Sequence, residues 1–183
     1  MRKRRHAQIH DHLVPDPLHE IFAQELAHAP PGHKDELRLW LRLLTCTNLI
    51  EGEIRTRLRR DFATTLPRFD LLAALDRVPG GMTLGEVSRR MMVSNGNVTG
   101  LAARLEADGL VERRAVPGDR RAQKLRLTAR GRREFARQSA AHEGWVAELV
   151  AGLPPNARTS LFALLGRAKG SVRAALSTSK DPA

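Results

Sequence analysis

The stretch from residue 83 to residue 109 constrains the fold of this chain more than any other, because helix start and stop signals follow one another closely in it. Thr83 and Glu86 have the spacing of a capping box, which satisfies the first backbone N–H groups of a helix. Ser94 has the chemistry of a second N-cap, and Gly109 stands where a glycine ends the helix that Ser94 begins. Two short capped helices joined by a tight turn are therefore predicted.

Two strand-like runs follow these helices, and we expect them to form a β-hairpin. The runs cover residues 110–116 and 123–127, and the intervening residues 117–121, Pro-Gly-Asp-Arg-Arg, have the composition of a turn. A hairpin directly after two capped helices is the order of a helix-turn-helix with a wing.

Long helices are expected on both sides of this region. Apolar residues recur at helical spacing from Asp35 to about Phe62, from Leu66 to Arg77, from Thr128 to about Ala151 and in a last helix to Leu176, after a short helix that starts near Asp16. The predicted fold class is mainly α with a small β-hairpin wing (α+β), a winged helix-turn-helix flanked by long dimerisation helices. The expected parts are a flexible basic, His-rich arm (1–15), N-terminal helices for dimerisation and a ligand cleft (16–64), the winged helix (65–128), C-terminal dimerisation helices (129–176) and a disordered tail (177–183).

The helix after Ser94 has an outer face without long side chains. Its apolar face is Val98, Leu101, Ala102 and Leu105, and the other positions are Asn95, Gly96, Asn97, Thr99, Gly100 and Ala103. Each glycine costs about 1 kcal/mol of helix propensity, which a close approach to a partner would explain. The major groove of B-DNA admits one helix, and there asparagine pairs with adenine while a threonine methyl contacts thymine.

Charge also favours a nucleic-acid partner. The net charge is +11, and residues 113–133 contain nine basic side chains but one acidic one, Asp119. We expect Arg120 in the minor groove, Asp119 holding a neighbouring arginine, and Arg121 and Lys124 at phosphates. The predicted DNA contacts are Ser94, Asn95, Gly96, Asn97, Thr99, Arg104, Arg113, Asp119, Arg120, Arg121 and Lys124. The alternative is a solvated basic hairpin on a winged helix that binds protein.

The same region resembles the MarR family of bacterial transcriptional regulators. The residues that carry the resemblance are GMTLGEVSRRMMVSNGNVTGLAARLEADGLVERR and PGDRRAQKLRLTARGR, within residues 71–133. The resemblance implies a homodimer whose terminal helices interlock and which binds double-stranded DNA at a pseudo-palindromic operator. It further implies a repressor that a small anionic effector releases, here an aromatic acid or its coenzyme A thioester.

Such an effector would bind in a cleft between the dimerisation helices and the winged helix. We expect Trp40 and Phe69 to stack against a ring, and Arg38, Arg42 or Arg68 to pair with a carboxylate or phosphate. The alternative for each residue is a core aromatic side chain or a solvated charge.

Other chemistry is less well supported. The chain has one cysteine, Cys46, which we expect to be a buried, inert thiol, so no disulfide framework exists and a cytoplasmic location is predicted. Six histidines lie within the first 33 residues, which leaves a metal- or redox-responsive regulator on the same scaffold as an alternative. The sequence shows neither the motifs of an enzyme nor a membrane-spanning stretch, and we predict no cofactor and no metal site.

Overall fold

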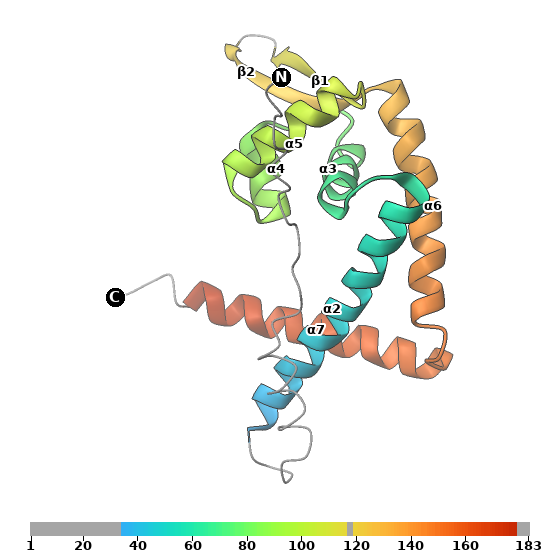
Figure 1. Ribbon diagram of the computed structural model, residues 1–183. Coiled ribbons are helices and arrows are strands. Elements are labelled where there is room, and N and C mark those ends of the chain that lie inside the picture. Colours follow the sequence, from blue (N-terminus) through green and yellow to red (C-terminus); the bar gives the residue numbers. More distant parts are fainter. Residues whose placement is uncertain (1–33, 117–118, 179–183) are drawn as a thin grey trace, which may run out of the picture. The chain divides into compact units, whose positions relative to one another are not determined.

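The computed structural model of the protein describes residues 34–116 and 119–178, without the side chains of residues 116–122. In this part of the chain six helices and two strands follow one another (Figure 1): α2 Asp35–Phe62, α3 Leu66–Asp76, α4 Leu84–Met91, α5 Asn95–Ala107, β1 Val111–Val116, β2 Asp119–Leu127, α6 Ala129–Leu149 and α7 Pro155–Thr178. The predicted fold class, mainly helical with a two-stranded wing, is confirmed. The basic arm and the helix expected after Asp16 lie outside the described residues. The chain forms two compact units, divided between Phe135 and Ala136.

Helices α3, α4 and α5 enclose one apolar core together with the hairpin. Helix α3 is central to it, because it contacts α4, α5 and β2. Figure 1 shows α5 beside α4, with the two strands at one end of the group. The core residues are Leu71, Leu72, Leu75, Met82, Val87, Val98, Leu101, Ala102, Leu105, Leu110, Val111, Leu125 and Leu127.

Capping interactions define the helix-turn-helix as the sequence predicted. The Thr83 hydroxyl accepts from the Glu86 N–H at 3.2 Å, while the Glu86 carboxylate accepts from the Thr83 N–H at 2.7 Å. The Thr83 N–H and the Thr83 hydroxyl, which donates to the same carboxylate at 3.0 Å, hold the pKa of Glu86 below its usual value. The turn then passes through Met92 at φ 55°, and the Ser88 hydroxyl donates to the Val93 carbonyl at 2.6 Å. The direction in which α5 leaves α4 is therefore fixed by local hydrogen bonds.

The wing is an antiparallel pair, with Val111 opposite Leu127 and Arg113 opposite Leu125. The Leu125 backbone also exchanges two hydrogen bonds with Met82, of 3.0 and 2.7 Å. The residue before Met82 must be a glycine, because a Cβ on Gly81 would stand 2.5 Å from the Leu125 carbonyl oxygen. The hairpin is thereby attached to the segment that leads into α4.

The start of β2 corrects the sequence analysis. We expected residues 119–121 in the turn, but β2 begins at Asp119, which pairs with Val116. The residues Asp-Arg-Arg have low strand propensity. The hydrogen bonds between two strands are made by backbone groups, however, so charged residues can also pair in a strand.

The first turn of α6 is locked onto the link between α5 and β1. The Thr128 hydroxyl donates to the Gly109 carbonyl at 2.8 Å and accepts from the Gly131 N–H at 2.9 Å. A Cβ on Gly131 would stand 1.9 Å from the Leu110 carbonyl oxygen. This close approach explains why residue 131, three positions after Thr128, is a glycine.

Helix α2 is only partly covered by the rest of the chain. Leu41, Ile54 and Leu58 are buried, but Cys46 is exposed, so the expectation of a buried thiol is wrong. The apolar neighbours of Cys46 suggested burial, yet several of the apolar side chains in this half of the helix are themselves exposed: Leu37, Leu39, Trp40 and Leu49.

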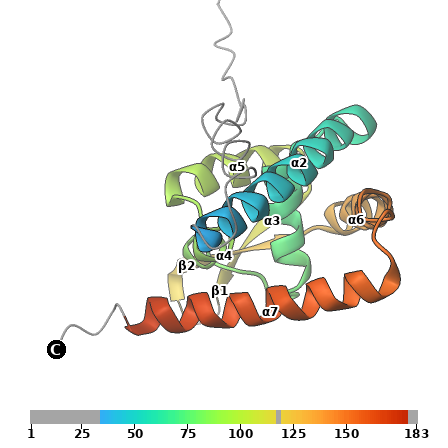
Figure 2. The same ribbon diagram turned by 90° about the horizontal axis from the view of Figure 1, so that it is seen from below.

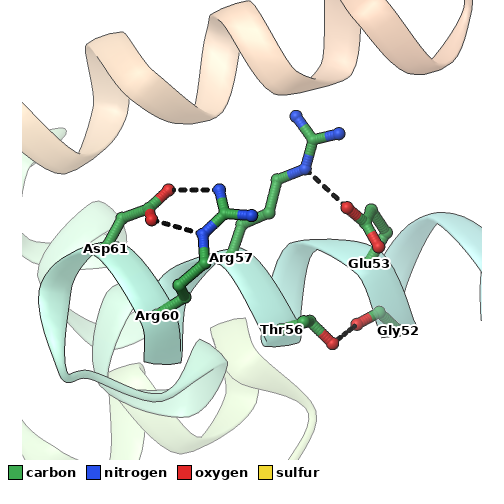
Figure 3. A network of polar contacts seen from close by, with 6 residues as sticks. All are labelled: Gly52, Glu53, Thr56, Arg57, Arg60 and Asp61. Carbon is green, nitrogen blue, oxygen red and sulfur yellow. Dashed lines mark hydrogen bonds and ion pairs between the residues drawn. The ribbon is translucent and has the colours of Figure 1, made fainter.

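The C-terminal half of α2 carries a polar network along its surface (Figure 3). Arg57 Nε donates to the Glu53 carboxylate at 2.6 Å, and Arg60 donates to both oxygens of Asp61 at 2.6 and 2.9 Å. Both pairs join residues of the same helix, so they support α2 locally.

Helix α7 is one uninterrupted helix (Figure 2), and none of its residues is buried. We expected a disordered tail from Ser177, but Ser177 and Thr178 are helical. Their hydroxyls donate to the Ala174 carbonyl at 2.8 and 2.9 Å, which ties the last helical residues back to the preceding turn.

A substitution of Gly131 tests the locked start of α6. Gly131→Ala should destabilise the fold by about 2 kcal/mol or more, because the new methyl group forces the α6 backbone away from Leu110. Gly144→Ala in the same helix is the matched control, since a Cβ there meets nothing within 4 Å. The control should stabilise by about 0.5–1 kcal/mol. Urea unfolding measures both changes, and equal midpoints for the two variants would contradict the assignment.

Candidate nucleic-acid interface

Helix α5 separates its side chains into a buried face and a bare face. Val98, Leu101, Ala102 and Leu105 are buried in the core. All the residues predicted to face DNA on this helix are exposed: Asn95, Gly96, Asn97, Thr99 and Arg104. A Cβ on Gly96 or Gly100 would meet nothing within 4 Å, so the protein itself does not require glycine at either position.

The N-terminal end of α5 exposes short polar side chains. Ser94 caps the helix, since its hydroxyl accepts from the Asn97 N–H at 3.4 Å. The Thr99 hydroxyl donates to the Asn95 carbonyl at 2.8 Å, which leaves the methyl group as the outward contact surface of that side chain. The first turn therefore presents amide groups, a methyl group and backbone.

The outer face of the hairpin carries an excess of positive charge. Arg114 stands directly opposite Lys124, and Glu112 stands opposite Arg126. Like charges opposite one another destabilise a strand pair, and Arg114 relieves this in part by pairing with Glu112 at 2.9 Å. That pair raises the pKa of Arg114 and lowers that of Glu112. An incoming phosphate would relieve the remaining repulsion.

One of the predicted DNA contacts, Arg113, takes a different form from the one expected, and three others cannot be compared with the structure. Arg113 lies partly buried in an ion pair with Glu106 of α5, at 3.1 Å, so it joins the wing to the helix. Asp119, Arg120 and Arg121 belong to β2, and their side chains lie outside the described residues.

Sequence analysis missed Arg89 and Arg90, which are exposed in the last turn of α4. In a helix-turn-helix the first helix crosses the DNA backbone, so adjacent arginines at its end are suited to phosphates. The Arg-Arg pair immediately before the turn was the signal in the sequence.

The residues predicted to bind an effector have different surroundings in the described structure. Arg68 pairs with Asp108, and Phe69 is buried with its ring 5.5 Å from that of Phe135. Arg38 lies 3.6 Å from Asp35, and Trp40 and Arg42 are exposed. Phe69 thus belongs to the protein core, which was the alternative considered for it.

A different cavity, of about 290 Å³, lies between α3 and α4. Its walls are Asp70, Ala73, Ala74, Arg77, Arg90 and Met91. Asp70 is exposed at the edge of the cavity, but burial beside neighbouring protein atoms and the nearby Glu51 carboxylate raise its pKa to about 6, against the opposing effect of Arg55. The cavity therefore combines two guanidinium groups, one readily protonated carboxyl group and three apolar side chains.

Two negative findings apply to the described residues. No three His, Cys, Asp or Glu side chains gather there as they would around a metal ion. None of the helices α2 to α7 is long and apolar enough to cross a membrane.

Comparison with known proteins agrees with this geometry. A family model described as MarR family matches residues 64–122. The HTH-type transcriptional regulator PecS of Dickeya dadantii is 30% identical over 148 residues, which cover 80% of this chain and 89% of PecS. The transcriptional activatory protein BadR of Rhodopseudomonas palustris is 37% identical over 97 residues, which cover 52% of this chain and 55% of BadR.

Solved structures show the same fold. A MarR family regulator from Silicibacter pomeroyi is 30% identical with a TM-score of 0.66, covering 79% of this chain and 99% of that one. A regulator from Streptomyces coelicolor in complex with DNA is 23% identical, covers 79% and 92%, and has a TM-score of 0.66. CouR from Rhodococcus jostii, bound to p-coumaroyl-CoA, is 21% identical, covers 69% and 88%, and has a TM-score of 0.61.

Gly100→Ala tests whether the bare face of α5 approaches a partner closely. The substitution should stabilise the fold by up to about 1 kcal/mol through helix propensity, because the added methyl group meets nothing in the protein. It should weaken DNA binding tenfold or more, because the methyl group holds the helix away from the bases. Gly52→Ala on α2 is the matched control, with nothing within 4 Å of its Cβ. Urea unfolding measures the stability, and a DNA titration measures the affinity. The assignment is wrong if Gly100→Ala binds DNA as tightly as the wild type.

Proposed function

This chain belongs to the MarR family of transcriptional regulators, and from that membership we propose that it is a homodimeric repressor which a small anionic effector releases from a pseudo-palindromic operator. The relatives it matches are transcriptional regulators rather than enzymes. The dimer, repression and the effector are the proposed parts.

The bare face of α5 is the observation that carries sequence-specific DNA binding. A helix that exposes two asparagines, two glycines and a threonine methyl group fits the major groove, where long side chains would prevent close approach. Lys124, which stands opposite Arg114 on the wing, adds positive charge that favours phosphate contacts beside the helix.

Exposed apolar surface on two helices supports a homodimer. Within the described residues, the N-terminal half of α2 and the whole of α7 expose large apolar side chains: Leu37, Leu39, Trp40, Leu49, Leu161, Phe162, Leu164, Leu165, Val172 and Leu176. Apolar patches of this extent mark protein contact sites. A two-fold dimer would place two α5 helices about one DNA turn, roughly 34 Å, apart.

Repression is the simpler way in which such a dimer can act. A regulator that covers an operator blocks the promoter by occupancy alone, whereas activation needs a further contact with the transcription machinery. BadR is named an activatory protein. A reporter assay that compares transcription with and without this chain decides between repression and activation.

The cavity between α3 and α4 supports the effector. Its volume of about 290 Å³ is just below the range of most ligand sites, roughly 300–1,000 Å³. It therefore suits a one-ring aromatic acid better than a whole coenzyme A thioester. Arg77 and Arg90 can bind the carboxylate, and Ala73, Ala74 and Met91 can support the ring.

Fluorescence anisotropy with DNA from upstream of the chain's own coding sequence tests the dimeric, DNA-binding part. Affinity should fall steeply with salt, since each neutralised phosphate contributes about −0.9 to the log–log slope. Leu165→Asp should separate the protomers and weaken binding at least tenfold, because one winged helix holds one half-site. Ala163→Asp, on the other side of α7, is the control. If Leu165→Asp still sediments as a dimer and binds normally, this interface is wrong.

The pH dependence of effector binding tests the cavity. Benzoate should bind more tightly as pH falls from 7.5 to 5.5, because protonation of Asp70, whose pKa is about 6, removes a negative charge beside the ligand. Asp70→Asn should bind tightly at pH 7.5 and lose this pH dependence. Asp76→Asn, in the same helix but not in the cavity wall, should behave as wild type. Calorimetric titration of the protein without DNA measures all three, and an unaltered pH profile in Asp70→Asn rules the cavity out.

A further inference from the structure

We infer that Arg68 is a positioning residue for operator recognition, because its ion pair with Asp108 fixes the C-terminal end of α5 on α3. This inference rests on the proposed DNA-binding function. The Arg68 Nη2 atom lies 2.5 Å from the Asp108 Oδ2 atom, although the two residues are 40 positions apart in sequence. Arg68 is in the first turn of α3, and Asp108 is the C-cap of α5.

Each of these two charges is unfavourable within its own helix. The N-terminus of a helix carries partial positive charge and its C-terminus partial negative charge. Arg68 therefore places a cation at the positive end of α3, and Asp108 places an anion at the negative end of α5. Both penalties are compensated only when the two ends meet. The pair thus favours one placement of α5 relative to α3.

The bare face of α5 explains why such a fixed end is needed. The apolar face of α5 decides which side packs on the core, but apolar contacts are not directional and leave tilt and sliding poorly defined. On the outer face there is no long side chain except Arg104 that can adapt to an error in position. A small tilt would therefore move Asn95 and Asn97 away from the base edges.

A second ion pair acts at the same end of the helix. Glu106, in the last turn of α5, pairs with Arg113 of β1 at 3.1 Å. The Gly109 N–H donates to the Glu106 carbonyl and the Leu110 N–H to the Leu105 carbonyl, both at 2.9 Å. Arg113 thus joins α5 to the wing, which follows it closely in sequence. Arg68 joins α5 to α3, which is distant in sequence.

Reversal of one charge, followed by reversal of both, tests the inference. Arg68→Asp places an anion at the start of α3, which suits that helix, but it repels Asp108. We expect at least tenfold weaker binding to a DNA duplex that the wild type has selected from a random library. The affinity for an unselected duplex should change little, and the thermal unfolding midpoint should not fall. The double reversal Arg68→Asp, Asp108→Arg keeps the pair and suits both helix ends. It should recover most of the affinity.

Hydrogen exchange of residues 104–110 in the free protein gives a readout without DNA. Exchange there should be faster in Arg68→Asp and return toward the wild-type rate in the double reversal. Arg60→Asp, which breaks the exposed Arg60–Asp61 pair on α2 (Figure 3), should alter neither exchange nor affinity.

Three results overturn the inference: normal affinity in Arg68→Asp, no recovery in the double reversal, or unchanged exchange at residues 104–110. If the wild type itself selects no duplex, the proposed function fails and the exchange data alone decide the role of Arg68.

Discussion

The rest of the structure depends on the packing of one short helix. Helix α5 buries Val98, Leu101, Ala102 and Leu105, and apart from Arg104 and Glu106 near its C-terminal end its other positions are small or carry amides. Since the outer face provides almost no contacts within the protein, the position of α5 is determined by what lies beneath it and at its ends. The capped turn from α4, the core around α3 and the link to the wing can all be understood as fixing this helix from the side away from its partner.

Several residues in the winged helix are poor choices for stability alone. Gly96 and Gly100 weaken α5 although space for a larger residue is free, and Arg114 faces Lys124 across the ladder. Each departure has a local cost, and each lies where DNA would contact the protein. This coincidence argues for nucleic acid, because a solvated basic hairpin on a protein-binding module would not need a bare helix beside it.

The sequence predicted the elements whose signals are local. Capping residues and apolar spacing placed α2 to α5 to within about a residue, since those signals act within one or two turns. The exposure of Cys46 and the partners of Arg68 and Phe69 depend on residues far away in sequence, so spacing did not reveal them. The cavity between α3 and α4 likewise arises from two helices that only the folded chain brings together.

The cavity between α3 and α4 lies close to the start of α5, so a ligand there could alter the position of α5 with little motion. Met91 and Arg90 in its wall are the last two residues of α4, and the turn that caps α5 begins at Met92. A ligand that separates α4 from α3 would therefore act on the entry to α5 directly, without passing through the dimer. To reverse a 99:1 equilibrium it must favour the altered state by about 5.5 kcal/mol. Two charge-assisted hydrogen bonds of roughly 1.5–3 kcal/mol each, from Arg77 and Arg90, are of this size if they form in that state alone.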